Sequence, residues 1–221
     1  RPLYPASMIK TPLAAAVLML CARERLALDD VVTVTGANMT HNDLDSPFEP
    51  GYQARIDDLM EAMISRSDNV ATNVLIDVAG RDQASAVCHE LGLHHTFIRR
   101  KLSGSLPLID DPEATGRNAH PACDAALLFE QIARGTVPGY QHLLDMLLRQ
   151  HWNTKLSAGL FPADRFAHKT GDTDEVCHDG GILIAEDGRT YVLVAYTRLP
   201  GESDASDARL ARFMHMLRPL L

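Results

Sequence analysis

The C-terminal stretch GGILIAEDGRTYVLVAYTRL constrains the fold more than any other part of the chain. Two apolar runs flank Asp187 and Gly188, and Asp-Gly between such runs is a strong signal for a β-hairpin, because both residues tolerate a tight turn. Residues 166–171, just before the hairpin, are predicted to add a third antiparallel strand. Three strands alone would leave an edge and an apolar face uncovered, which is a poor state for a free domain, so we expect that an N-terminal segment is missing from this chain.

Helical patterns occupy most of the chain before the hairpin. Residues 7–24 are almost entirely apolar, so this helix should be buried on all sides, with Pro12 in its first turn or so. A β-branched run at 31–35 predicts a short strand, and polar segments with Gly and Pro predict long loops at about 36–53 and 96–121. Further helices are predicted at 56–65, 71–78, 83–91, 122–134, 139–149 and 204–217. Helices in the middle and a sheet at the end indicate the α+β class.

The composition limits the expected partners. The chain has 221 residues, of which 46% are hydrophobic, so it can bury a substantial core. Its formal net charge is −8 and it has no basic run, so we expect a small substrate rather than nucleic acid or an anionic membrane. The longest apolar stretch, 12–22, is too short to span a bilayer, and residues 1–5 do not resemble a signal peptide. On these grounds the chain could be cytosolic, mature after export, or trimmed.

The four cysteines, at positions 21, 88, 123 and 177, are widely spread. No CxxC motif occurs, so neither a zinc site nor a redox motif is predicted. Two disulfides are permitted but not required, and we favour small buried side chains. The histidines at 94, 95 and 151 show no ligand spacing, so no metal and no cofactor are predicted.

The segment YPASMIKTPLAAAVLML places Ser7 and Lys10 at the head of the apolar helix. Residues three apart share a helix face. A serine hydroxyl is a weak nucleophile until a base takes its proton, and burial lowers the pKa of a lysine, so the two could form a nucleophile and its base. A capping serine with a lysine reaching toward solvent is the structural alternative.

Two further stretches bear on this choice. The first is Ser67-Asp68-Asn69, which lies between two helical patterns and could also cap the second helix. The other is Lys169-Thr170-Gly171, on the strand before the hairpin, which could simply end an edge strand. The set S-x-x-K, S-D-N and K-T-G, in that order, is the motif set of class A β-lactamases and penicillin-binding proteins. Three chance matches in the right order are far less expected than one.

The chain therefore resembles the class A β-lactamase and penicillin-binding protein superfamily over nearly its whole length. The resemblance implies an all-helical lobe beside an antiparallel sheet, with the active site between them. We expect one catalytic domain over residues 1–221, with a helical lobe at about 7–160 and the C-terminal strands and helix at about 161–221. Members of this family also carry a helix and two strands before the catalytic serine, which are expected to be missing from this chain.

The resemblance also implies roles for individual residues. Ser7 would attack a carbonyl carbon and Lys10 would accept its proton, while Ser67 would pass a proton to the leaving nitrogen. The oxyanion would lie between the backbone N–H groups of Ser7 and Asp172. Substrate binding would fall to Asn69 for an amide and to the Lys169-Thr170-Gly171 strand for a carboxylate.

The long loop departs from the class A pattern. A class A β-lactamase has a glutamate there, which activates the water that hydrolyses the acyl-enzyme. Aligning Arg100 with the family's loop arginine puts Lys101, Leu102 and Ser103 where that glutamate should fall, and none is an acid. Three acids lie farther along and could fold back or face solvent: Asp110, Asp111 and Glu113.

A second departure lies in the strand at 176–184. It lacks the arginine with which many β-lactamases hold the substrate carboxylate, and His178 and Asp179 stand in that neighbourhood. We predict that His178 contributes to substrate binding, with a hydrogen-bonded pair of His178 and Asp179 lining the cleft or, alternatively, packing roles for both.

These features favour a penicillin-binding or D,D-peptidase-like serine hydrolase that acylates with β-lactams and turns them over weakly. Two alternatives remain at this point: a true class A β-lactamase that uses a relocated loop carboxylate, and a non-catalytic sensor acylated by β-lactams. The expected substrate is a β-lactam or a peptidoglycan peptide, and the expected protein is an exported monomer in the periplasm or outside the cell.

Overall fold

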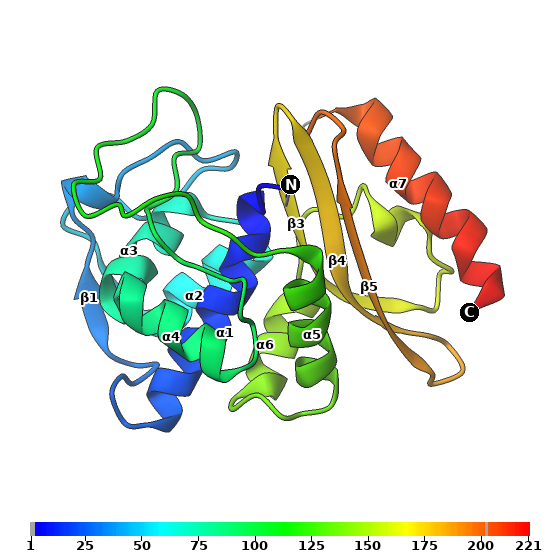
Figure 1. Ribbon diagram of the computed structural model, residues 1–221, viewed down its shortest axis with the longest axis horizontal. Coiled ribbons are helices and arrows are strands. Elements are labelled where there is room, and N and C mark those ends of the chain that lie inside the picture. Colours follow the sequence, from blue (N-terminus) through cyan, green and yellow to red (C-terminus); the bar gives the residue numbers. More distant parts are fainter. Residues whose placement is uncertain (1–2, 202) are drawn as a thin grey trace.

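The computed structural model describes residues 3–201 and 203–221 and has two lobes, one helical and one built on a sheet (Figure 1). The helical lobe contains α1 to α6, and the other lobe contains a three-stranded antiparallel sheet with the C-terminal helix α7 (Asp204–Leu217) on its outer face. This arrangement confirms the predicted α+β class. Within these residues no helix is long and apolar enough to cross a membrane.

Helix α1 (Lys10–Ala22) lies at the centre of the helical lobe. Every residue from Lys10 to Leu18 is buried, as expected for a helix that is apolar on all sides. The predicted start at Ser7 is instead a short 3₁₀ turn, η1 (Ala6–Ile9), that leads directly into α1. The helices that contact α1 are α2 (Ile56–Ser65), α3 (Asn69–Ala79), α4 (Arg81–Glu90) and α6 (Tyr140–Leu148).

The sheet has the order β3-β4-β5, with β3 at Arg165–Thr173, β4 at Val176–Ile184 and β5 at Thr190–Thr197. Lys169 pairs with Gly180 across the β3–β4 ladder. Because side chains alternate along a strand, Ala167 joins the core of the helical lobe, whereas Phe166 packs with α7. Helix α5 (Ala122–Ala133) packs against β4 and β5 on the helical side.

A second, two-stranded sheet lies in the helical lobe. Strand β1 (Val31–Thr33) was expected, but its partner β2 (Gln53–Arg55) lies where the sequence predicted the end of a loop. Three residues with one apolar side chain carry too little pattern to reveal a strand. Residues 98–118 contain neither helix nor strand, and an isolated bridge between Phe97 and Ala119 closes this long loop at its base.

The outer face of the main sheet is sealed by α7 and by η3 (Leu156–Gly159). A Cβ atom on Gly159 would lie 2.1 Å from the Ala211 carbonyl oxygen, so only glycine permits this close approach of η3 to α7. All four cysteines are free, and two of them, Cys88 and Cys177, are buried.

Candidate active site

Ser7 lies in η1, at the junction of the two lobes, and is partly exposed. Strand β3 passes directly beside this turn. A Cβ atom on Gly171 would lie 2.9 Å from the Pro5 carbonyl oxygen and 3.0 Å from the Met8 nitrogen, so a glycine is needed for the strand to come so close. The preceding residue, Ala6, has a left-handed φ of 47°. The turn that carries Ser7 is therefore held tightly against the sheet.

Lys10 follows one turn later and is completely buried. Its Nζ donates to the Ser67 carbonyl oxygen at 2.5 Å, to the Ser67 Oγ at 3.0 Å and to the Asn69 Oδ1 at 2.7 Å. Burial holds the pKa of Lys10 well below its usual range, and the nearby charge of Lys169 lowers it further. A lysine whose pKa is lowered in this way gives up its proton more readily than a free lysine and can then accept one from a neighbouring hydroxyl.

Ser67 lies between two lysines that come from different lobes. Its Oγ is 3.0 Å from the Nζ of Lys10 and 3.0 Å from the Nζ of Lys169. Lys169 is also completely buried, and burial lowers its pKa to about 7. A hydroxyl between two lysines of lowered pKa can pass a proton from one nitrogen to the other.

The turn at Ser67 has an unusual backbone. Ser67 has a φ of 62°, which is rare for a residue with a side chain. Asp68 caps α3 by accepting from the Ala71 N–H at 2.8 Å, so the capping interpretation of this motif is correct for the aspartate. Ser67 also borders a small hollow, which opens between the turn and the polar loop and is lined by Asn42, Asp43, Leu44, Arg66, Ser67 and Asp68.

Asn69 is buried, and its side chain makes contacts within the protein. Its Oδ1 accepts from Lys10, its Nδ2 donates to the His41 carbonyl oxygen at 2.9 Å, and its backbone N–H donates to the Asn42 Oδ1 at 2.5 Å. Asn69 therefore fixes Lys10 and the polar loop. Its role toward a substrate amide stays a prediction.

Thr170 and Asp172 are the other β3 residues with predicted roles. Thr170 is buried, and its carbonyl oxygen accepts from Lys169 at 3.0 Å. The carboxylate of Asp172 is bonded to Lys155 at 2.8 Å, on the face of the sheet that packs with α7. Sequence analysis did not identify Lys155, because a single lysine between a loop and a 3₁₀ turn gives no signal.

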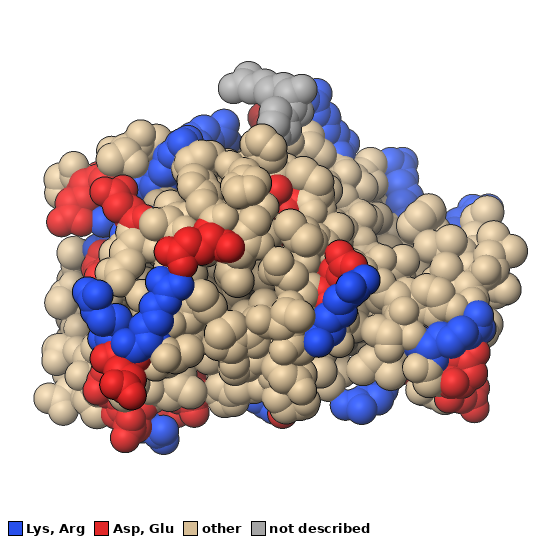
Figure 2. All heavy atoms as spheres, turned by 60° about the horizontal axis from the view of Figure 1, so that its bottom comes forward, with Lys and Arg blue, Asp and Glu red and all other residues tan. Residues whose placement is uncertain are grey.

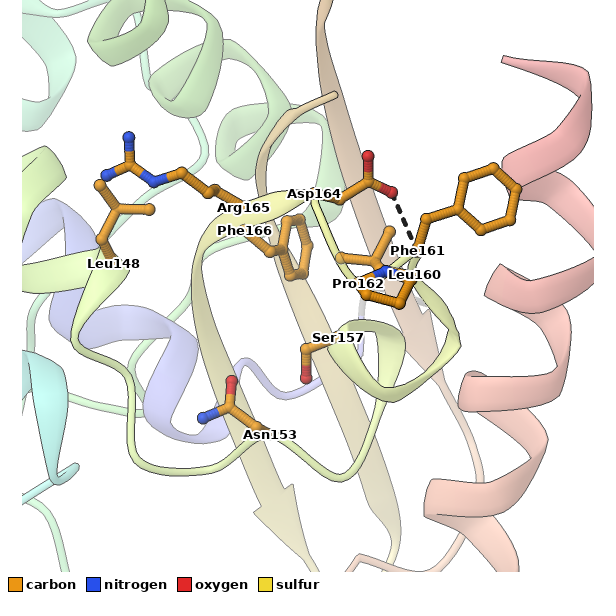
Figure 3. A pocket seen from close by; sticks show the side chains of 9 residues that line it. All are labelled: Leu148, Asn153, Ser157, Leu160, Phe161, Pro162, Asp164, Arg165 and Phe166. Atoms are coloured by element: carbon orange, nitrogen blue, oxygen red, sulfur yellow. Dashed lines mark hydrogen bonds between the residues drawn. The ribbon is translucent and has the colours of Figure 1, made fainter. Parts of the chain in front are cut away.

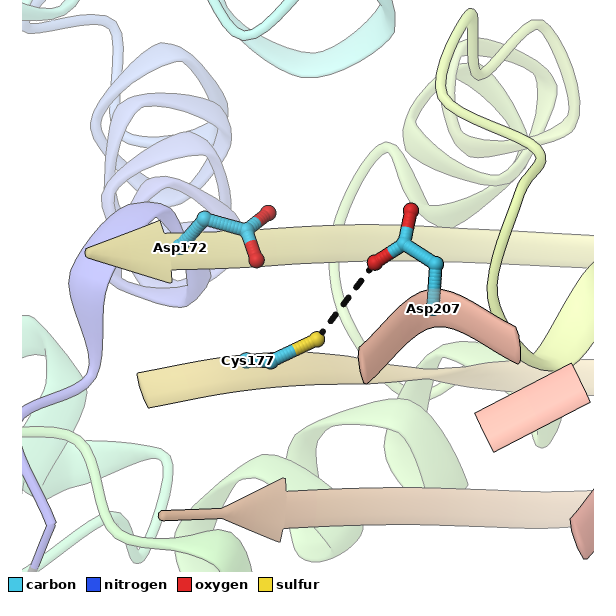
Figure 4. Close-up of side chains that lie close together, drawn as sticks. All are labelled: Asp172, Cys177 and Asp207. Carbon is cyan, nitrogen blue, oxygen red and sulfur yellow. Dashed lines mark hydrogen bonds between the residues drawn. The ribbon is translucent and has the colours of Figure 1, made fainter. Parts of the chain in front are cut away.

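Asp172, Cys177 and Asp207 form a cluster that could in principle hold a metal ion (Figure 4). The Nζ of Lys155 already lies there, 2.8 Å from Asp172 and 3.5 Å from Asp207. Burial raises the pKa of Cys177 to about 12, so its thiol is protonated. A lysine cation between two carboxylates makes this cluster an ion-pair network, which fits a metal poorly.

The structure corrects the prediction for His178, which is completely buried on the helical side of β4. Its Nδ1 accepts from the Thr197 N–H at 3.1 Å, so its Nε2 carries the proton and donates to the Tyr4 carbonyl oxygen at 2.9 Å. The ring also stacks on Tyr196 at a centroid distance of 4.1 Å. Neither ring nitrogen is free for a substrate, and His178 instead fastens the segment that leads to Ser7.

The predicted pair of His178 and Asp179 is also wrong. Consecutive strand residues point to opposite faces, so Asp179 lies on the side of α7. There its Oδ1 bonds the Nδ1 of His168 at 2.7 Å, and its Oδ2 accepts from the Leu156 N–H at 2.9 Å.

The long loop places Leu102 against the helical lobe. Its N–H donates to the Asn73 Oδ1 at 2.7 Å, and its carbonyl oxygen accepts from the Asn73 Nδ2 at 3.0 Å. Lys101 is buried and its Nζ lies 2.7 Å from Asp77. The stretch where class A enzymes carry their glutamate is therefore fixed in place without an acid.

The loop acids proposed as substitutes are mostly engaged. Arg81, at the start of α4, binds the carboxylates of both Asp111 and Glu113. Asp111 also accepts from the Lys101 N–H at 2.7 Å. Of these three acids, Asp110 is exposed and forms no ion pair with the residues that the structure describes.

A hollow of about 440 Å³ lies at the start of β3, and neither of the two active-site lysines lines it (Figure 3). Its single carboxylate, Asp164, is bonded to Arg218 at 2.6 Å. The hollow therefore offers no free base. On the face shown in Figure 2, acidic and basic side chains are interspersed, so that face has no extended patch of one charge.

Comparisons with known proteins agree with this geometry. A model of the beta-lactamase enzyme family matches residues 1–213. A protein named beta-lactamase from Bacteroides uniformis is 26% identical over 229 residues, which cover 96% of this chain and 76% of the relative. These matches confirm the resemblance drawn from the three motifs.

Solved structures give the same result. The structure of PBP-A is 28% identical with a TM-score of 0.84, and covers 98% of this chain and 80% of its own. A leucine-to-glutamate variant of PBP-A, solved as an acyl-enzyme complex with penicillin G, has a TM-score of 0.86 at 27% identity over the same shares, 98% and 80%. A beta-lactamase from Sphaerobacter thermophilus has a TM-score of 0.83 at 25% identity, covering 100% of this chain and 85% of that one.

Proposed function

Because this chain belongs to the beta-lactamase enzyme family, we propose that Ser7 is the nucleophile of a serine hydrolase that forms an acyl-enzyme. One observation carries the proposal: the buried lysines Lys10 and Lys169 both bond the Ser67 hydroxyl, and Lys10 begins α1 three residues after Ser7. In this arrangement Lys10 can take the proton of the Ser7 hydroxyl, and Ser67 can pass a proton to the leaving nitrogen of the substrate.

The proposed reaction starts at Ser7. The Ser7 Oγ attacks the carbonyl carbon of a β-lactam or of a D-alanyl-D-alanine-type peptide, and Lys10 takes the hydroxyl proton. The C–N bond then breaks, and the leaving nitrogen receives a proton through Ser67. The N–H groups of Ser7 and Asp172 stabilise the oxyanion, and Lys169 with Thr170 binds the substrate carboxylate. Water finally releases the acid and restores Ser7.

We further propose that release is the slow step with β-lactams. The positions expected for the catalytic glutamate are Lys101, Leu102 and Ser103, and Leu102 in their middle is held at both its N–H and its carbonyl oxygen by Asn73. This supports a penicillin-binding, D,D-peptidase-like enzyme with weak β-lactam turnover. The chemistry uses only side chains and backbone groups, and we propose that the protein acts as an exported monomer in the periplasm or outside the cell.

A true β-lactamase is the second candidate. The relative from Bacteroides uniformis carries that name, and Asp110 is an exposed loop acid that could serve as the base. Asp111 and Glu113 favour this candidate less, because Arg81 holds both of them.

Fluorescent penicillin distinguishes these candidates. Wild type should be labelled rapidly and release the label slowly, and Ser7→Ala should not be labelled at all. Sustained fast hydrolysis of nitrocefin would support the second candidate. Labelling of Ser7→Ala would refute the assignment of the nucleophile, and a D-alanyl-D-alanine peptide assay would test the peptidase activity directly.

A further inference from the structure

Ser67 and Lys169 meet although they belong to different lobes. Ser67 follows α2, Lys169 lies on β3, and their side-chain atoms are 3.0 Å apart. A catalytic contact of this kind has to be held to within about 0.5 Å by surrounding groups. The segment between α6 and η3 supplies such groups, because its residues 150–153 bond to both elements.

Gln150 is the central residue of this segment and is buried. Its Nε2 donates to the Ile64 carbonyl oxygen at 3.0 Å and to the His168 carbonyl oxygen at 3.2 Å. Ile64 lies in the last turn of α2, where helix carbonyls lack helical partners, and His168 directly precedes Lys169. One amide group therefore ties the end of α2 to β3.

The amide is well suited to this position. A glutamine offers two N–H donors on one nitrogen and an acceptor oxygen, without a charge. Both donors are used in the two contacts above, and the Gln150 Oε1 accepts from the Trp152 N–H at 3.2 Å. A charged side chain here would place a cation or an anion next to the strand that carries Lys169.

The next two residues bond the backbone of the Ser67 turn. The His151 N–H donates to the Ser65 carbonyl oxygen at 2.8 Å. The Trp152 Nε1 donates to the Arg66 carbonyl oxygen at 3.3 Å. With Ile64, three consecutive carbonyls before Ser67 are thus held by three consecutive residues of this segment.

Asn153 bonds the strand side. Its Oδ1 lies 3.1 Å from the Nε2 of His168, and its Nδ2 donates to the Gln150 carbonyl oxygen at 2.6 Å. Asn153 borders the hollow at the start of β3, where it is drawn in Figure 3. On the other side of the ring, the His168 Nδ1 bonds Asp179, so β3 is held from both sides.

We propose that Gln150 is a positioning residue that fixes the distance between Ser67 and Lys169. The expected effect on acylation rests on the proposed function. The link that Gln150 makes between α2 and β3, called the brace below, is a structural claim. Without the two N–H donors, the carbonyls of Ile64 and His168 lose a shared partner, and the Ser67 turn can move relative to β3. Displacements of about 1 Å reduce rates by about 100-fold.

The test compares Gln150→Met with a matched variant, Gln131→Met. Gln131 also donates its side-chain Nε2 to a backbone carbonyl, that of Leu91 at 2.8 Å, and this bond involves neither β3 nor the Ser67 turn. Acylation by fluorescent penicillin is followed at increasing concentration. For Gln150→Met we expect the maximal rate constant to fall about 100-fold with the half-saturating concentration little changed, because no substrate-binding group is removed.

For Gln131→Met we expect both parameters to stay within about threefold of wild type. A wild-type maximal rate in Gln150→Met, or an equal loss in Gln131→Met, would overturn the inference. If Gln150→Met does not fold, Gln150→Asn keeps a neutral amide but is one methylene shorter, so that its donors cannot reach both carbonyls, and the same outcomes apply to it.

Amide hydrogen exchange separates this inference from the proposed function. Gln150→Met should accelerate exchange at residues 65–69 and 167–170, whereas Gln131→Met should not. If wild type binds no penicillin, the proposed function fails, and exchange alone decides whether the brace exists. Unchanged exchange at both stretches would refute the brace even in an active enzyme.

Discussion

Strand β3 separates two buried lysines of opposite character. Lys169, on the face toward the helical lobe, meets a hydroxyl, a carbonyl oxygen and the neighbourhood of a second lysine, and burial lowers its pKa to about 7. Lys155, on the face toward α7, is also buried, and burial alone would lower its pKa. The carboxylates of Asp172 and Asp207 outweigh burial there and raise it.

The difference shows that burial does not decide what a lysine can do. Partners with a full negative charge keep a buried lysine protonated, which makes it a structural cation. Neutral partners do not compensate for the desolvation of the buried charge. The lysine therefore loses its proton near neutral pH, as Lys169 does, and can act as a base. The two environments lie on opposite faces of a single strand.

The largest effect is expected at Lys10, which shares the Ser67 hydroxyl with Lys169. Lys10→Met should reduce acylation of Ser7 by about 10³-fold, because the base that takes the hydroxyl proton is lost. The rate of labelling by fluorescent penicillin measures this. Lys155→Met is the matched control and should acylate within about tenfold of wild type; an equal loss in both variants would contradict the separation of roles.

On the face of β3 toward α7, Lys155→Met should lower the free energy of unfolding by about 3 to 5 kcal/mol. The substitution leaves the carboxylates of Asp172 and Asp207 close together without their cation. Denaturant unfolding at neutral pH measures the loss, and adding Asp172→Asn should recover part of it. Unchanged stability would show that the ion-pair network contributes nothing.

An acid introduced at Leu102 tests why release of the acyl group is expected to be slow. Leu102→Glu should accelerate release of the acyl group by about 100-fold, since a carboxylate would then stand where the family places its water-activating glutamate. The loss of fluorescent label over time measures release. Leu102→Gln, of equal size but unable to accept a proton, should release the label at the wild-type rate.

The smallest expected effect is on the pH dependence of stability. Between about pH 7 and the unfolded value near 10.5, Lys169 binds fewer protons in the folded than in the unfolded state, so stability rises with pH. From pH 7 to 8.5 the gain should be roughly 1 to 2 kcal/mol. Lys155 has a raised pKa, so its stabilisation is complete below its unfolded value and adds no slope in this window.

Denaturant unfolding of wild type and Lys169→Met at the two pH values isolates this contribution. The slope should be smaller in Lys169→Met than in wild type. Equal slopes would mean that another group titrates in this range.

The motifs in the sequence predicted the meeting of Lys10, Ser67 and Lys169, and nothing in the sequence indicated the ion pairs of Lys155. Ser7, Lys10, Ser67 and Lys169 stand in motifs whose order is far from random, and the apolar helix and the Asp-Gly hairpin have strong local patterns. Lys155 has no such pattern, because its partners lie 17 and 52 positions further along the chain and meet it only through the fold.

Two other failures have equally physical causes. Strand β2 is too short to show an alternation, and it forms because β1 offers it a ladder. The role in substrate binding was predicted for His178 because it stands close in the sequence to the position of an arginine that holds the substrate carboxylate in many β-lactamases. A strand turns successive side chains to opposite faces, and the buried contacts with Tyr4 and Thr197 depend on the packing of the N-terminal segment, which no local pattern shows.

The left-handed backbone at Ala6 and Ser67 has a consequence for how the protein could change. Both positions next to or at the proposed reacting hydroxyls hold residues that prefer another conformation, with φ of 47° and 62°. Glycine at either position would relax the chain and favour the folded state. At Ala6 the change would loosen the turn that carries Ser7, and at Ser67 it would remove the hydroxyl itself, so the simplest routes to a more stable protein here would reduce its activity.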